Sequence, residues 1–515
     1  MKKTAQKSAS KVAYVSPQQL VIPGFETPFS QHLDANNRWV KLASLIPWDA
    51  LCGQYLKKIG ISSTGRPPIN PRIVIGSLII KHLGDLDDRE TVAQISENPY
   101  MQYFLGYSSF CSQKPFDASL FVEFRKNIDI ELINSINDVI IAHQTSLEAP
   151  TSSEKNDDTS NKSSNNQNQT EHEADNISVK EIITHKGTAI MDATACPQNI
   201  AYPTDLGLLN SAREKSEDLI DLLYNKELHK KKPRTDRDTA RKLFLQTAQK
   251  RKKTRTEIRK AIRRQLGFLR RNIRSIDKLL DSYDAIPLKP KDYKYMLVIR
   301  HVLEQQETMF NNKSHSIEHR IVSIHQPHVR PIVRGKAQAA VEFGSKIHLS
   351  LIDGFSFLDE LSWEAFNEGS HLERYIEQYK QRFGFYPHTL LVDKIYCTRE
   401  NRRYLKEKGI ELHAKPLGRP KAVGYHVSPG ERNPIEGKFG QAKTAYGLNC
   451  IRARLQVTSQ SWIASIILVL NLVKLAGVIP YCLCRNFITL LNWCWRIACL
   501  KKNSDLRFFL SFSGG

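Results

Sequence analysis

The chain has 515 residues, with 75 Lys or Arg against 53 Asp or Glu and a formal net charge of +22. This length exceeds the usual size of a single hydrophobic core, so two or three domains are expected. The charge favours a polyanionic partner, either nucleic acid or an anionic membrane surface. The nine cysteines form no CxxC pair and no zinc-finger spacing, which argues against a structural zinc and indicates reduced thiols.

The first part of the chain divides into an arm and a helical domain. Residues 1–36 carry positive charges but no apolar run of signal-peptide type, so we expect the protein to stay in the cytoplasm. Residues 37–148 show apolar spacing typical of helices, with turn-rich breaks near 63–71 and 108–115. We predict an all-α domain with a role in DNA binding or assembly.

The composition changes abruptly after this domain. Residues 149–178 contain the polar run TSSEKNDDTSNKSSNNQNQTEHEADN, which cannot bury a core. This segment is predicted to be a disordered linker that separates two domains.

Strand and helix signals alternate over residues 179–480, which predicts an α/β domain with a mixed sheet. A first strand leads into Asp192 and is expected to turn there. Further strands are expected in RIVSIHQP, in VRPIV, in AAVEFGSKIHLSLIDGFSF, in HTLLVDKIY and in IELHAKPL. Residues 481–515 are interpreted as a C-terminal tail.

A basic helical region interrupts this alternation. Between Lys230 and Lys278 there are 20 Lys or Arg and 4 Asp or Glu, and apolar residues recur at spacings of three or four. An amphipathic helix with a basic outer face is predicted. A solvated charged face is the alternative, but the excess of one sign favours contact with phosphates.

One apolar stretch needs a decision between core and membrane. Residues 455–473, LQVTSQSWIASIILVLNLV, are uncharged and long enough to span a bilayer. The polar residues in its first half favour a buried core helix over a membrane span.

Three carboxylates have positions that suggest chemistry. Asp192 and Asp393 follow strand signals, and Glu436 lies on a late helix. If they converge at one edge of the sheet, they could bind Mg²⁺, a hard ion that prefers oxygen ligands. Asp205 and Asp353 also lie near strand ends and are alternative ligands, and a strand-end Asp is more often a turn or cap residue.

Four segments resemble successive motifs of bacterial insertion-sequence transposases with a DDE catalytic domain. They are MDATACPQNIAYPTDLGLLNSAREKSEDLID, IHLSLIDGFSF, LVDKIYCTRENRRYLKEKGIEL and RNPIEGKFGQAKTAYGLNCIRARL. The N-terminal INPRIVIGSLIIKHLGDLDDRETVAQISENPYMQYFLG resembles the helical domain common in the same transposases.

This resemblance implies a ribonuclease H-like catalytic domain over 179–480, with a basic helical insertion at 211–319. It implies that Asp192, Asp393 and Glu436 are the catalytic carboxylates and hold Mg²⁺, with Mn²⁺ as a substitute. The family signature around the Glu is Tyr, two residues, Arg, three residues, Glu, six residues, Lys. The chain matches it at Arg432, Glu436 and Lys443, and Pro429 stands at the Tyr position.

The same resemblance implies DNA as the partner, both the transposon ends and the target, bound by a homodimer and without a membrane. The residues expected to contact DNA are Arg432, Lys443, Tyr396, Lys438, Arg263, Arg264, Arg270 and Arg271. The expected function is cut-and-paste DNA transposition in the nucleoid. Two alternatives remain open: a catalytically inactive transposase remnant that regulates by binding DNA, and a membrane-associated basic protein.

Overall fold

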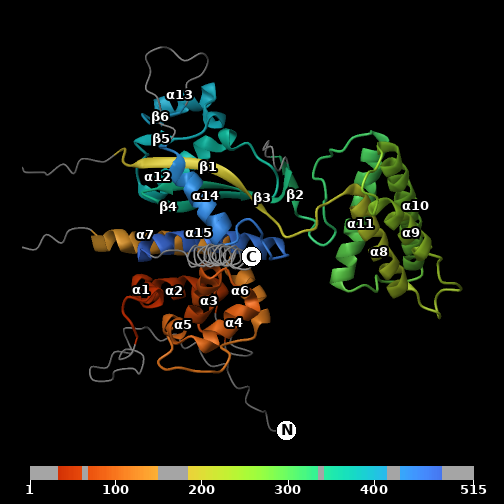
Figure 1. Cartoon of the computed structure of the whole chain (residues 1–515), viewed down its shortest axis with the longest axis horizontal. Coiled ribbons are helices and arrows are strands. Elements are labelled where there is room, and N and C mark those ends of the chain that lie inside the picture. The colour runs from red at the N-terminus through yellow and green to blue at the C-terminus, as the bar shows by residue number, and fades with distance from the viewer. Residues whose placement is uncertain (1–32, 61–67, 149–183, 334–340, 415–429, 478–515) are drawn as a thin grey trace, which may run out of the picture.

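The part of the chain that the computed structural model describes comprises residues 33–60, 68–148, 184–333, 341–414 and 430–477 (Figure 1). The predicted linker and C-terminal tail, most of the predicted arm, and Pro429 lie outside these residues.

The N-terminal part is helical, as the apolar spacing predicted. Asparagine and aspartate side chains cap several of the helices; for example, Asn37 accepts from the Trp39 N–H, Asn70 from the Arg72 N–H, and Asp87 from the Arg89 N–H. The helices are α1 (Arg38–Leu45), α2 (Trp48–Ile59), α3 (Pro71–Leu83), α4 (Asp88–Glu97), α5 (Pro99–Phe104), the short η2 (Ala118–Leu120), α6 (Phe121–Asn127) and α7 (Ile130–Glu148).

A six-stranded mixed sheet forms the centre of the second half. Its strands are β1 (Thr188–Pro197), β2 (Arg330–Val333), β3 (Val341–Ile352), β4 (Phe355–Ser362), β5 (Thr389–Leu391) and β6 (Glu411–His413). Strand β3 pairs antiparallel with β1, β2 and β4, whereas β5 pairs parallel with both β1 and β6. The order β2-β3-β1-β5-β6 therefore places β1 between its antiparallel and its parallel partner.

Helices cover both faces of this sheet. On one face, α12 (Leu372–Phe383) and α13 (Arg399–Glu407) pack with Ala189 and Met191 of β1. On the other face lie α14 (Asn433–Ala445) and α15 (Gln456–Ala476). Two 3₁₀ turns, η3 (Glu368–His371) and η4 (Lys394–Tyr396), precede α12 and α13. Since side chains alternate along a strand, Asp192 points to the α14 face.

The N-terminal helices and the sheet share one hydrophobic core through α15. Helix α15 is buried for most of its length, and α3, α6, α7 and β4 pack around it. In Figure 1, α7 and α15 lie between the sheet and the other N-terminal helices. Helix α15 is the one described helix long and apolar enough to cross a membrane, and 78% of that apolar window is buried in the protein. The prediction of a core helix is confirmed.

A separate helical bundle is inserted between β1 and β2. It consists of α8 (Asp205–Leu223), α9 (Arg237–Ala248), α10 (Arg255–Leu280) and α11 (Pro290–Asn311). Thr254 and Glu257 form a capping box that starts the long helix α10. The bundle has its own apolar core and stands to one side of the sheet (Figure 1).

Two predictions about strands were wrong. Strand β1 continues for five residues beyond Asp192, so this carboxylate lies within the strand rather than at a turn. The stretch RIVSIHQP forms no strand. Its apolar side chains are used otherwise, because Ile321 and Ile324 complete the bundle core while Val322 packs with Val329 and Trp363.

Candidate active site

Asp192 and Asp393 come from neighbouring parallel strands. Asp192 lies in β1 on the face that α14 covers, and its Oδ1 accepts a 2.8 Å hydrogen bond from the Ala193 N–H. Asp393 follows β5 by two residues and caps η4, where its Oδ1 accepts a 2.8 Å bond from the Lys394 N–H. The β1–β5 pairing therefore brings together two carboxylates that are 201 residues apart in sequence.

The guanidinium of Arg432 lies between these two carboxylates. Its Nη2 is 3.4 Å from the Asp192 Oδ2, and its Nη1 is 3.2 Å from the Asp393 Oδ1. Arg432 occupies the N-cap position of α14, and Ile435, Phe439 and Ala442 anchor that helix in the core. The helix thus delivers a cation to the point where the two aspartates converge.

Glu436 lies one turn further along α14. It shares a stripe of the helix with Arg432 and Lys443, because spacings of four and seven residues return to the same side. Its side chain is exposed, and no group of three or more His, Cys, Asp or Glu close enough to hold a metal occurs in the described part of the chain. The convergence of Asp192, Asp393 and Glu436 on one ion therefore stays a prediction.

The surroundings of Asp192 raise the pKa of its carboxyl group above the ordinary value. Burial is the largest cause of its raised pKa, and the negative charges of Asp393 and Glu368 raise it further. The Ala193 N–H and Arg432 act in the opposite direction without reversing the shift. A cation at this site would therefore stabilise the ionised form of a partly buried carboxylate.

Glu368 is a residue of this environment that the sequence did not reveal. It lies in η3, is largely buried, and pairs with the Lys346 Nζ of β3. No local signal distinguishes it, since it sits in an ordinary helix-forming stretch. Only the packing of η3 against η4 brings it near Asp192.

Tyr396 does not fit its predicted role in DNA contact. Its ring is 0% exposed and packs in the core on the α12 face, with Tyr375 and Leu405. Burial raises the pKa of its hydroxyl well above the usual value, and the negative charge of Asp192 adds to this effect. The η4 turn rotates the ring inward, so Tyr396 packs behind Asp393 instead of facing solvent.

The two lysines of α14 differ in their surroundings. Lys438 is half-buried, and its pKa is lowered by burial and then by the charge of Lys474. Lys443 lies in the last turn of α14 and is partly exposed. Between Glu436 and Lys443, a Cβ added at Gly440 would meet no atom within 4 Å, so this stripe faces open space.

The four predicted DNA-contacting arginines of α10 fall into two pairs. All four are exposed. Arg270 pairs with Glu307 at 2.5 Å, and Arg271 pairs with Asp236 at 2.9 Å. Arg263 and Arg264 make no ion pair with any described residue.

The alternative ligands Asp205 and Asp353 have structural roles. Asp205 begins α8 and pairs with Arg320 at 2.7 Å. Asp353 and Gly354 form the β3–β4 turn with φ values of 49° and 77°. Two successive positive φ values are typical of a tight hairpin turn, for which Asp-Gly is a preferred pair.

Comparisons with known families identify two regions of the chain. Residues 27–127 match the transposase domain DUF772, and residues 390–473 match the transposase DDE domain. The first region covers most of the N-terminal helices, and the second contains Asp393, Arg432 and Glu436. Asp192 lies outside both matches. The two matches support an insertion-sequence DDE transposase, as the sequence motifs predicted.

One curated relative is similar over a limited region. The uncharacterized protein ORF8 in the nfe locus of Rhizobium meliloti is 36% identical over 107 residues, which is 19% of this chain and 49% of that protein. The match thus spans about half the length of that relative. No solved structure matches the chain.

Proposed function

We propose that this chain, an insertion-sequence DDE transposase by its two family matches, binds the ends of its own element and catalyses their cleavage and transfer to target DNA. One observation carries the proposal: Asp192 and Asp393, from neighbouring parallel strands, converge on a single cationic group. Paired carboxylates of this kind suit phosphoryl transfer through bound divalent ions. The mixed sheet with helices on both faces supports the ribonuclease H-like core that the sequence resemblance implies.

The donor set around Arg432 fits Mg²⁺, with Mn²⁺ as a substitute. The guanidinium stands in for a cation, since both aspartates direct an oxygen toward it. Hard ions prefer such carboxylate oxygens, and Asp192, Asp393 and Glu436 would hold the ion. When bound, the metal would supply an activated water and stabilise the leaving 3′ oxygen.

The basic residues of α14 would position the DNA. Arg432 can exchange its two carboxylates for a phosphate, because a guanidinium fork binds either group through two parallel hydrogen bonds. Lys443, on the same stripe of α14, would contact a neighbouring phosphate across the open surface at Gly440. Lys438 is less suited to this role because it is half-buried. Two DNA ends must be held together during transposition, so we propose two copies of the chain on DNA.

The decisive experiment incubates the purified protein with labelled DNA that carries the repeats flanking its own gene. We expect cleavage and strand transfer with Mg²⁺ or Mn²⁺, and none with EDTA. Asp192→Asn should abolish both products and leave DNA binding intact. Asp353→Asn is the matched control, because position 353 lies outside the site and Asn is well tolerated in this type of turn. Strand transfer by Asp192→Asn would refute the assignment.

The second candidate is a DNA-binding regulator without catalytic activity. The exposed position of Glu436, outside any three-residue metal-binding group in the described part of the chain, is the observation that favours it. The same assay separates the candidates. Specific binding to the end DNA with no product in either metal would support the regulator and overturn the enzyme.

A further inference from the structure

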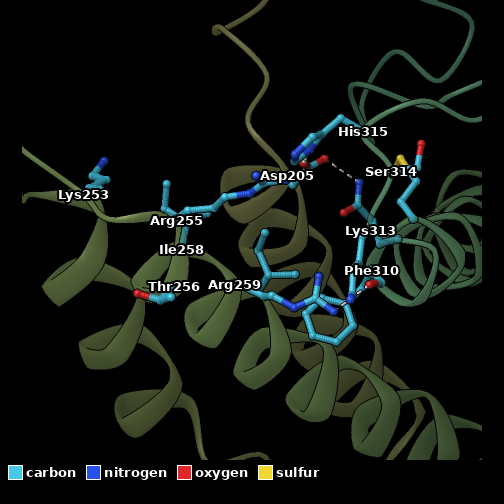
Figure 2. A pocket seen from close by; sticks show the side chains of 13 residues that line it. Asp205, Lys253, Arg255, Thr256, Ile258, Arg259, Phe310, Lys313, Ser314 and His315 are labelled. Atoms are coloured by element: carbon cyan, nitrogen blue, oxygen red, sulfur yellow. Dashed lines mark hydrogen bonds and ion pairs between the residues drawn. The ribbon is translucent and has the colours of Figure 1, made fainter.

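A pocket of about 680 Å³ opens on the helical bundle, and none of Asp192, Asp393 and Glu436 is among the residues that line it (Figure 2). It lies between the start of α10 and the end of α11, beside the start of α8. Its volume is within the range of small-molecule and cofactor sites. The family resemblance assigns no role to this pocket.

The floor of the pocket is apolar and carries a planar group. Ile258, Ile262 and Met309 line it, together with the Phe310 ring. The Arg259 guanidinium lies 4.1 Å from the centre of that ring and donates a 3.0 Å hydrogen bond to the Phe310 carbonyl oxygen (Figure 2). The hydrogen bond holds the guanidinium in place. A flat aromatic or heterocyclic ligand could stack on this pair.

The rim of the pocket is cationic. Lys253, Arg255 and Lys313 are exposed, and none of them makes an ion pair with any residue that the structure describes. The acidic group at the pocket, Asp205, is already compensated, because it pairs with Arg320 and accepts a 3.0 Å hydrogen bond from Gln306. An anionic group on the ligand would therefore meet uncompensated positive charge.

The pocket is continuous with a basic track along α10. Arg255, Arg259 and Arg263 recur every four residues and so lie on one stripe of the helix, which starts in the pocket. The neighbouring Arg264 is exposed as well. A polyanion that follows this stripe would reach the pocket at its end. This continuity favours a nucleic acid over a free metabolite.

The pocket also lies within reach of the carboxylates along a DNA substrate. Asp205, at the edge of the pocket, follows Asp192 by 13 residues, which limits their separation to about 45 Å. One helical turn of B-form DNA spans about 34 Å. A duplex with its scissile phosphate at Asp192 could therefore place a nucleotide at the pocket within little more than one turn.

We infer that this pocket binds one unstacked nucleotide of the DNA substrate, with the base on Arg259 and Phe310 and its phosphate at the rim formed by Lys253, Arg255 and Lys313. This inference rests on the proposed function, because it requires DNA as the ligand. The pocket would recognise an unpaired nucleotide or a distorted base pair in the DNA. It would therefore be a second DNA-recognition site, distinct from the carboxylates.

The test compares two DNA probes with the full chain. One probe is a fully paired duplex, and the other is the same duplex with one extra, unpaired 2-aminopurine nucleotide. We expect the bulged duplex to bind roughly tenfold more tightly, the size of effect typical of stacking one base on an aromatic side chain. The 2-aminopurine fluorescence should change on binding because its stacking partner changes.

Three variants identify the pocket as the cause of that preference. Phe310→Leu removes the aromatic ring and leaves the charge unchanged, so it should abolish the preference and preserve binding of the paired duplex. The double variant Lys253→Ser with Lys313→Ser removes two exposed charges. It should weaken binding of the bulged duplex more than binding of the paired duplex. Arg274→Ser with Lys278→Ser makes the same charge change at the far end of α10 and should affect both probes equally.

The outcomes are distinct. Equal affinity of the wild-type protein for both probes, or an unchanged preference in Phe310→Leu and in the lysine pair, overturns the nucleotide pocket and leaves the proposed function standing. Loss of self-association in Phe310→Leu with an unchanged preference would assign the pocket to a second copy of the chain, which also overturns the inference. Failure of both probes to bind the wild-type protein would instead refute the proposed function, and the nucleotide pocket with it.

Discussion

The N-terminal helices α1–α7 share a hydrophobic core with α15 and β3, whereas the bundle α8–α11 has a core of its own. Both regions are helical by sequence pattern, and both are joined to the sheet by the chain. The two regions differ in whether their apolar side chains pack against the core of the sheet. The N-terminal helices surround the apolar helix α15, while the bundle keeps its apolar side chains inside and is connected by the segments that flank β1 and β2.

A charge cluster with two buried cations lies at the contact between the N-terminal helices and α15. Asp88 pairs with Lys81 at 3.0 Å and with Arg125 at 2.8 Å, and both cations lie over the Trp462 ring of α15. Lys81 and Arg125 are 1% and 4% exposed, so Asp88 is the group that compensates their charges. Substitutions in the bundle core are therefore expected to affect the bundle alone. Substitutions around α15 are expected to affect both the N-terminal helices and the sheet.

The largest expected effect comes from breaking the fused region. Asp88→Asn should lower the free energy of unfolding by about 4 kcal/mol, because it leaves two buried cations without their compensating charge. The N-terminal helices and the sheet should unfold in one transition in urea. Circular dichroism and tryptophan fluorescence measure that transition. Glu123→Gln, in an exposed pair with Lys126, is the control and should cost less than about 1 kcal/mol. Separate transitions for the two halves would contradict the shared core.

Acid should reproduce this effect. Burial raises the pKa of Asp88, but hydrogen bonds and charges from Arg125 and Lys81 outweigh it, so the pKa is lowered overall. A lowered folded-state pKa gives stability that is present above the unfolded value of about 3.9 and is lost as the pH falls through the folded one. The difference between wild type and Asp88→Asn should therefore shrink in this acidic range.

Breaking the bundle should have a local effect. Leu269 is 0% exposed in the bundle core, and Leu269→Ala should cost about 3 kcal/mol through the cavity it leaves. Amide hydrogen exchange should accelerate in α8–α11 and stay unchanged in α15 and the sheet. Leu470→Ala, in the core of α15, is the matched variant and should accelerate exchange in the N-terminal helices as well. Faster exchange throughout the chain in Leu269→Ala would argue against an independent bundle core.

The basic face of the bundle gives a smaller effect on DNA affinity. Arg263 and Arg264 are exposed without an ion pair to any described residue, whereas Arg270 and Arg271 pair with acidic groups. Replacing Arg263 and Arg264 by Ser should reduce the slope of log K against log salt by about 1.8. The same change at Arg270 and Arg271 should reduce it less. Equal slopes for wild type and the first variant would place this face away from DNA.

The smallest effect concerns the stability of the carboxylate site without metal. The pKa of Asp192 is raised, chiefly by burial, so its ionised form costs stability above the folded pKa, and this cost disappears below about pH 4, where both states are protonated. In EDTA at pH 7, Asp192→Asn should raise Tm by on the order of 1–2 °C. The increase should vanish near pH 4, and a lower Tm at pH 7 would contradict it.

Several features of the fold and site were predictable from sequence because their causes are local. Helix caps such as Asn70 and Asp87, and the capping box at Thr254, act within three residues of the helix start. The Asp353–Gly354 turn and the polar first half of α15 are similarly local signals. The motifs also selected Asp192 and Asp393, the two carboxylates that both pair with Arg432 in the structure.

Other features depended on contacts between distant parts of the chain. Arg432 lies 240 residues from Asp192, and only the packing of α14 against β1 places its guanidinium between the two aspartates. The burial of Tyr396 follows from η4 packing toward α12, so a residue close behind Asp393 became part of the core. The exposed position of Glu436 depends likewise on how α14 sits.

The sequence by itself determined the helical or strand character of most segments, the excess of positive charge on α10 and the identity of the candidate carboxylates. The tertiary structure decided that one helical region shares the core of the sheet, that the other does not, and that a basic track on α10 ends in a pocket. The physical reason is the distance along the sequence over which each interaction acts. Capping, periodicity and turn preferences act over a few residues, whereas the pairing of β1 with β5 and the burial of α15 depend on side chains hundreds of residues apart.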